Sequence, residues 1–119
     1  MTQSYNELAK EISSSIGKMK GNIPETLQGF YQMSGAAMKG NAIDEKTKEY
    51  LALAIGIASR CSECIAFHTK ALVKLGTTKQ EFDEILAVCI YMGGGPSLMY
   101  AAKAEQAYEE FMSLSSSKK

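Results

Sequence analysis

Two cysteines and a histidine stand close together in the middle of the chain. Cys61 and Cys64 form a Cys-x-x-Cys pair, and His68, the only histidine in the sequence, follows four residues later. On a helix, this spacing brings the three side chains to one face. In a dithiol catalyst one sulfur attacks, the second sulfur resolves the bond that forms, and a base removes the thiol proton. The three residues therefore predict a thiol–disulfide oxidoreductase with a redox-active disulfide between Cys61 and Cys64.

Some of the charged groups near the two cysteines favour ionisation of the thiols, and others disfavour it. An ordinary cysteine has a pKa of about 8.5, so few such thiols are ionised at neutral pH. The positive N-terminal end of a helix and the imidazole of His68 both favour a thiolate. Arg60 adds a positive neighbour, whereas Glu63 adds a negative one that disfavours the thiolate.

A zinc site is the main alternative use of the same side chains. Cys61, Cys64 and His68 could supply three ligands, with Cys89 or a carboxylate as the fourth. Structural zinc modules usually contain a second Cys-x-x-Cys or a histidine pair, and this sequence has neither. Cys89 shares an apolar helix face with Phe82, which predicts a buried, unreactive thiol.

The periodicity of apolar residues predicts six helices, and no segment alternates in the manner of a strand. The predicted helices cover approximately residues 5–19, 24–37, 45–58, 59–75, 79–92 and 96–112. Pro24 and Pro96 stand at first helical positions, Asp44 is an N-cap, and residues 78–81 have the form of a capping box. The sequence therefore predicts one all-α domain over residues 1–119.

The third predicted helix contains an uninterrupted apolar run from Tyr50 to Ala58. A helix that is apolar on all sides is buried on all sides. In a chain of 119 residues we expect this helix to be central in the fold and part of a subunit interface. So short a chain also has a modest core, and both arguments predict a homo-oligomer.

Charge and hydropathy exclude two classes of partner. The 13 basic residues are balanced by 13 acidic residues and form no basic patch, so nucleic acid is not an expected partner. No stretch approaches the roughly 18 apolar residues that span a bilayer, and the polar first residues do not resemble a secretion signal. We therefore expect a cytoplasmic protein without a membrane partner, where structural disulfides are rare.

Glu49 completes a longer pattern around the cysteines. Glu49, eleven intervening residues, Cys61-x-x-Cys64, three more residues and His68 form this pattern. It resembles the motif of the alkylhydroperoxidase D branch of the carboxymuconolactone decarboxylase-like superfamily. The resemblance covers about residues 42–111 and includes a glycine-rich segment that begins at Gly93.

The resemblance implies an all-helical, alkylhydroperoxidase D-like fold assembled into trimers or hexamers. It also implies an antioxidant enzyme that reduces hydroperoxides directly, or passes electrons from a dithiol donor to a peroxiredoxin-type protein. No nucleotide or flavin motif is visible, so no cofactor is expected beyond the disulfide. A lactone decarboxylase, which the superfamily name suggests, is a further alternative, although that reaction requires no dithiol.

The resemblance also assigns roles to the site residues. Cys64 is then the thiol that becomes a sulfenic acid, Cys61 resolves it and exchanges with donors, and Glu49 and His68 form a proton relay. One position departs from well-known members, which have a histidine before the second cysteine where this chain has Glu63. A carboxylate there raises the pKa of a neighbouring thiol, which favours disulfide reduction over peroxide reduction.

Overall fold

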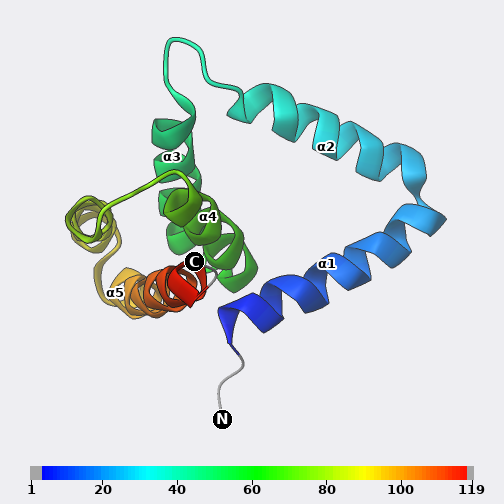
Figure 1. The fold of residues 1–119 in the computed structure, drawn as a ribbon. Helices are drawn as coiled ribbons and strands as arrows, with labels where there is room; N and C mark the ends of the chain where they lie inside the picture. The colour runs from blue at the N-terminus through cyan, green and yellow to red at the C-terminus, as the bar shows by residue number, and fades with distance from the viewer. Residues whose placement is uncertain (1–3, 118–119) are drawn as a thin grey trace.

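The computed structural model describes residues 4–117, and all regular structure in this range is helical (Figure 1). The helices are α1 (Tyr5–Asn22), α2 (Pro24–Met38), α3 (Glu45–Ala58), α4 (Ser62–Lys74) and α5 (Lys79–Ser117). Because α5 consists of two helices that meet at Gly94, the prediction of a six-helix, all-α domain is confirmed. Within the described range, no helix is both long and apolar enough to cross a bilayer.

α2, α3 and α5 begin where the local sequence chemistry predicts. Pro24 is the first residue of α2, and the Asp44 carboxylate accepts the backbone amide of Thr47 at 2.8 Å before α3. Before α5, the amide of Thr78 donates to the carboxylate of Glu81, and the amide of Glu81 donates back to the Thr78 hydroxyl. Each cap satisfies amides that the helix itself leaves without an acceptor.

The glycine triplet bends α5 sharply. Gly94 has φ 70° and ψ −150°, a backbone conformation that residues other than glycine rarely adopt. A Cβ at Gly93 would collide with the hydroxyl of Ser97, so a second glycine is needed for the close approach across the bend. Lys79 links the two halves of α5, because its ammonium forms ion pairs with Asp83 in the first half and Glu105 in the second.

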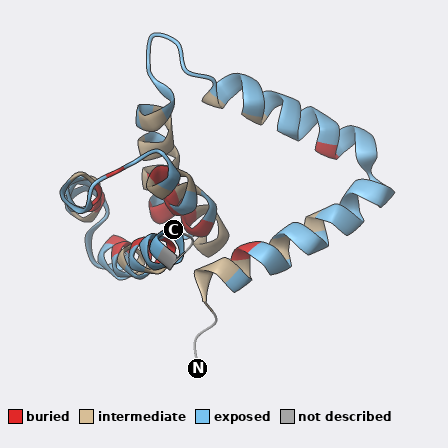
Figure 2. Ribbon diagram, in the orientation of Figure 1, coloured by how far each residue is buried: buried red, intermediate tan, exposed pale blue. Residues whose placement is uncertain are grey.

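The core lies among α3, α4 and the two halves of α5 (Figure 2). Leu53 and Ile57 of α3 are fully buried, which agrees with the predicted central helix. The other side of this helix is open in the single chain, since Leu51 and Ile55 are 52% and 68% exposed, and its burial in a subunit interface stays a prediction. The physical reason is that α4 and α5 pack against one side of α3 and leave its other side open.

α1 and α2 form an arm that extends away from this body (Figure 1). Both carboxylate oxygens of Glu110, on α5, accept backbone amides at the first turn of α1 and so attach its beginning to the body. α2 buries only Leu27, whereas Phe30 and Met33 are 56% and 61% exposed. The arm therefore presents a largely unsupported apolar surface.

Candidate active site

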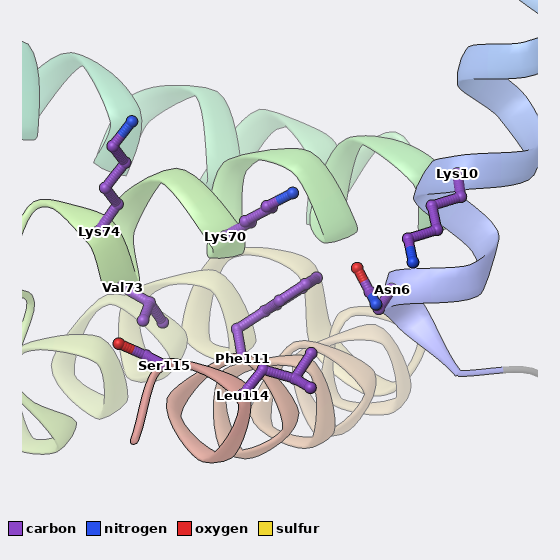
Figure 3. A pocket seen from close by; sticks show the side chains of 8 residues that line it. All are labelled: Asn6, Lys10, Lys70, Val73, Lys74, Phe111, Leu114 and Ser115. Atoms are coloured by element: carbon purple, nitrogen blue, oxygen red, sulfur yellow. The ribbon is translucent and has the colours of Figure 1, made fainter. Parts of the chain in front are cut away.

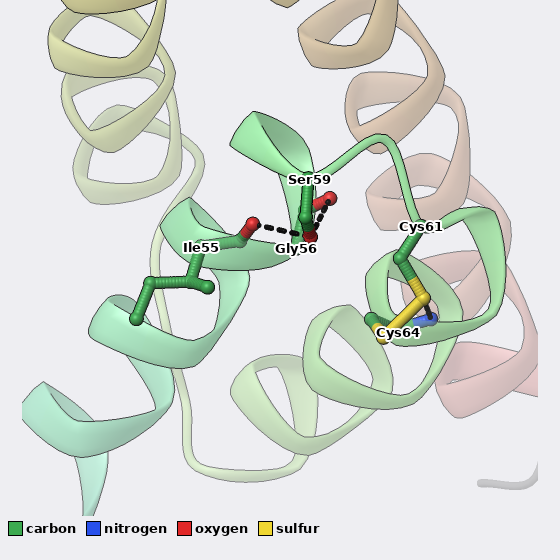
Figure 4. The surroundings of a disulfide bond; sticks show 5 residues. All are labelled: Ile55, Gly56, Ser59, Cys61 and Cys64. Carbon is green, nitrogen blue, oxygen red and sulfur yellow. Dashed lines mark hydrogen bonds between the residues drawn. A yellow bond between two sulfur atoms is a disulfide. The ribbon is translucent and has the colours of Figure 1, made fainter.

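The cysteine pair follows a tight turn between α3 and α4. The hydroxyl of Ser59 donates to the carbonyl of Ile55 at 2.7 Å (Figure 4). Arg60 follows with φ 59°, the single non-glycine residue of positive φ in the described range. The amide of Arg60 donates to the carbonyl of Ile57 at 3.1 Å and the amide of Cys61 to that of Gly56 at 2.9 Å. These two backbone bonds and the left-handed residue form a Schellman motif, which ends α3 and turns the chain toward α4.

Cys61 caps α4 instead of belonging to it. The helix begins at Ser62, and Cys61 has an extended backbone with φ −105° and ψ 97°. The backbone amide of Cys64 donates to Sγ of Cys61 at 3.2 Å. The expectation that Cys61 shares a helical face with Cys64 and His68 is therefore wrong, because the turn at Arg60 delays the start of the helix. As the cap, the Cys61 sulfur lies at the positive end of α4 and receives an amide donor, and both effects stabilise a thiolate.

Cys61 and Cys64 are joined as a disulfide (Figure 4). Their Cα atoms are 5.2 Å apart, a separation that disulfides ordinarily have. Gly56 allows α3 to pack directly against this pair, because a Cβ there would lie 3.1 Å from Cβ of Cys64. Cys89 is a free thiol in the core, where burial raises its pKa. The structure thus brings the predicted pair together and leaves the third cysteine apart.

His68 and Glu49 make direct contact across α3 and α4. Nδ1 of His68 lies 2.6 Å from Oε1 of Glu49, and their side chains are 29% and 12% exposed. A carboxylate bound to Nδ1 orients the imidazole and leaves Nε2 as the nitrogen that can exchange a proton with a reactant. His68 lies one helical turn after Cys64 on α4. The helix therefore places the His68–Glu49 pair next to the disulfide.

The candidate zinc ligands lie in two separate places, because Cys61 and Cys64 are at the start of α4 and Cys89 is in the core. In this disulfide form the described residues contain no group of three or more histidine, cysteine, aspartate or glutamate side chains that could hold a metal ion. Cys89, the candidate fourth ligand, is buried in the hydrophobic core with Phe82 and Leu86.

Two features of the site were not predicted from the sequence. Gly56 gave a weak signal, since an isolated glycine in an apolar helix often marks a close packing contact. Arg60 gave none, because an arginine in a left-handed conformation leaves no trace in composition or periodicity. Glu49 was identified only through the family pattern, and the structure places it on His68.

Comparisons with other proteins agree on one family. A sequence model of the carboxymuconolactone decarboxylase family matches residues 24–107. An uncharacterized protein of Cupriavidus necator is 32% identical over 104 residues, which are 87% of this chain and 92% of that protein. An uncharacterized protein of Haemophilus influenzae is 32% identical over 108 residues, which are 91% of this chain and 96% of that protein.

Solved structures share the fold over most of the chain. A carboxymuconolactone decarboxylase family protein from Legionella pneumophila has a TM-score of 0.88 and 45% identity, covering 91% of this chain and 96% of that one. A family protein from Thermotoga maritima, suggested to take part in an antioxidative response, has a TM-score of 0.80 and 21% identity. That comparison covers 91% of this chain and 95% of the Thermotoga chain.

Proposed function

The chain belongs to the carboxymuconolactone decarboxylase family, and we propose that it is a thiol–disulfide oxidoreductase of antioxidant defence whose working group is the Cys61–Cys64 pair. The observation that carries the proposal is the disulfide at the start of α4, in which the amide of Cys64 donates to the sulfur of Cys61. Lactone decarboxylation, which the family name describes, requires no dithiol, and so the pair favours redox chemistry.

In disulfide reduction, the reduced Cys61 thiolate attacks one sulfur of the substrate. A mixed disulfide forms on Cys61, and the other half of the substrate leaves as a thiolate. His68 then takes the proton of the Cys64 thiol, and the Cys64 sulfur attacks Cys61. This step closes the Cys61–Cys64 disulfide, releases the second thiolate, and lets the protonated imidazole return its proton to that leaving group.

In hydroperoxide reduction, we assign the first step to Cys64, which is one turn from His68. His68 takes the proton of the Cys64 thiol, the Cys64 thiolate attacks the terminal peroxide oxygen, and the O–O bond breaks, so that a sulfenic acid forms and the alkoxide leaves as the alcohol after taking that proton from His68. The Cys61 sulfur then attacks Cys64 and closes the disulfide, while the sulfenic hydroxyl leaves as water after taking the proton of the Cys61 thiol. In both reactions two electrons come from a dithiol donor, which reduces the disulfide and itself becomes a disulfide.

Turnover with a small dithiol reductant tests the proposal, using tert-butyl hydroperoxide in one series and a small aromatic disulfide in the other. We expect Cys61→Ser and Cys64→Ser to lose turnover in both series. Cys89→Ser, the matched control, should keep it, because this thiol is buried away from the disulfide. Full turnover by the Cys64→Ser variant in both series would contradict the proposed site.

We further propose that the chain works as a homo-oligomer, a trimer or hexamer as the resemblance implies. The support is the amount of apolar surface that a single chain leaves open, on α2, on α3 and on the first half of α5. Tyr91 and Met92 of α5 are 83% and 75% exposed, for example. Single soluble chains rarely leave so many large apolar side chains in contiguous exposed positions.

The dithiol donor and a peroxiredoxin-type protein remain the proposed redox partners. A donor must reach the Cys61 sulfur, and both Cys61 and Cys64 are partly exposed at the end of the turn. Loss of donor-dependent turnover in Cys61→Ser, with a sulfenic acid still trapped on Cys64, is the result expected for these roles.

A further inference from the structure

A hollow of about 510 Å³ lies between the first half of α1 and the C-terminal parts of α4 and α5 (Figure 3). This volume is within the range of small-molecule binding sites. The hollow has no part in the chemistry proposed above, because its α4 residues begin at Lys70 and belong to the end of the helix farther from the disulfide. It therefore needs a separate explanation.

One end of the hollow is positively charged. In Figure 3 the ammonium groups of Lys10, from α1, and Lys70, from α4, both extend toward the end where the Asn6 amide lies. Lys74 lines the other end. None of these three lysines makes an ion pair with a residue that the structure describes. Two ammonium groups and an amide donor form a suitable set for an anionic head group.

A carboxylate beside the hollow is already engaged. Glu110 lies close to this end of the hollow, and its two oxygens accept the backbone amides of Tyr5 and Asn6 at 2.9 Å each. Its charge therefore compensates the positive end of α1. The charge of Lys10 and Lys70 is left for another anion.

Apolar side chains from α4 and α5 also line the hollow. The ring of Phe111, which is only 4% exposed, extends from α5 toward Asn6, and Val73 and Leu114 lie on either side of its base (Figure 3). A ligand with only a charged group would leave this apolar surface in water, and a ligand with only an apolar chain would leave the lysines without a counter-ion. The site combines both properties within one cavity.

We propose that this hollow binds a single-chain amphiphile with a carboxylate head, that is, a fatty acid anion. The carboxylate lies between Lys10, Lys70 and the Asn6 amide, and the chain lies along Val73, Phe111 and Leu114. The site is separate from the disulfide and does not depend on the redox proposal.

Calorimetric titration of the full chain with decanoate tests this site, with decanol and acetate as the uncharged and tail-less comparisons. We expect decanoate to bind with one site per chain, and acetate and decanol to bind at least about tenfold more weakly, since each lost interaction worth about 1.4 kcal/mol changes Kd tenfold. The Lys10→Gln/Lys70→Gln variant should lose about tenfold in decanoate affinity. The matched control, Lys18→Gln/Lys20→Gln, removes two exposed α1 charges outside the hollow and should bind as the parent does.

Three results would overturn the proposal. Equal binding of decanol and decanoate would show an apolar surface without head-group recognition. Equal losses of decanoate affinity in the two double variants would show that the net charge of the protein, and not the hollow, attracts the anion. Equal binding of acetate and decanoate would show an anion site that does not recognise the apolar chain.

Discussion

Replacing Arg60 by glycine should stabilise the folded chain, although Arg60 adjoins the reactive pair. Arg60 is the left-handed residue of the Schellman motif that ends α3, with φ 59°. A residue with a Cβ in this conformation costs roughly 1–2 kcal/mol. Glycine avoids that cost but loses roughly 0.5–1 kcal/mol more backbone entropy on folding. The net gain expected for Arg60→Gly is therefore about 0.75 kcal/mol, the middle of a range from about 0 to 1.5 kcal/mol.

Denaturant unfolding at a fixed protein concentration measures this gain, with the Cys61–Cys64 disulfide intact in every sample. A chain of this length should also melt about 2–5 °C higher. Arg60→Ala is the matched control, because it removes the guanidinium but keeps the Cβ and should bring no gain. A stabilisation of Arg60→Ala equal to that of Arg60→Gly would refute the argument, since it would locate the cost in the charge and not in the backbone.

The same two variants also separate stability from activity. Both remove a positive charge next to Cys61, and both should react more slowly with an anionic aromatic disulfide than the parent does. With an uncharged disulfide the loss should be smaller. A gain in stability with a loss in rate would explain why an arginine occupies a position that suits glycine.

Replacing His68 by Gln should slow turnover by about 10²–10⁴-fold near neutral pH, and part of this loss should be recovered at higher pH, where the thiol ionises unaided. A pH profile of kcat checks this prediction, and a profile equal to that of the parent would contradict it. Because burial raises the pKa of the Cys89 thiol, iodoacetamide should label it far more slowly than the reduced pair, as peptide mass spectrometry would show. Light scattering should give a multiple of 12.9 kDa, and Phe30→Glu should lower the mass; a 12.9 kDa species in the parent would contradict the oligomer. The cap hydrogen bonds from Thr47 and Thr78 lower the pKa values of Asp44 and Glu81, so these groups stabilise the fold above their unfolded pKa. That stability should be lost as pH falls through their folded pKa values, and the loss should be smaller in Asp44→Asn when unfolding is measured between pH 6 and 3.

The starts of α2, α3 and α5 were predictable because short-range chemistry sets them. Pro24, the Asp44 cap and the Thr78–Glu81 box each act within one turn, and each lies at a helix start in the structure. The bend of α5 was predictable for the same reason, since the glycine triplet carries the conformational preference itself. The Cys-x-x-Cys spacing likewise predicted which two sulfurs meet.

What was not predictable depends on contacts between distant parts of the chain. The sequence placed Cys61 on a helix, because nothing local shows that Arg60 adopts a left-handed conformation. The contact of Glu49 with His68 joins residues on two helices, and only the family pattern pointed to it. The apolar run of α3 was correctly placed at the centre, but sequence periodicity cannot show which side of it the single chain leaves open.

The sulfur of Cys61 is both a reactant and the acceptor that begins α4, so the chemistry and the end of the helix share one atom. A thiolate is a strong acceptor for the Cys64 amide, whereas a sulfur in a disulfide is a weaker one. In the proposed cycle, reduction and oxidation of the pair therefore tighten and loosen the first turn of α4. The amide proton of Cys64 is a built-in reporter of this change. Its chemical shift and hydrogen-exchange rate follow the redox state of the pair without an added label.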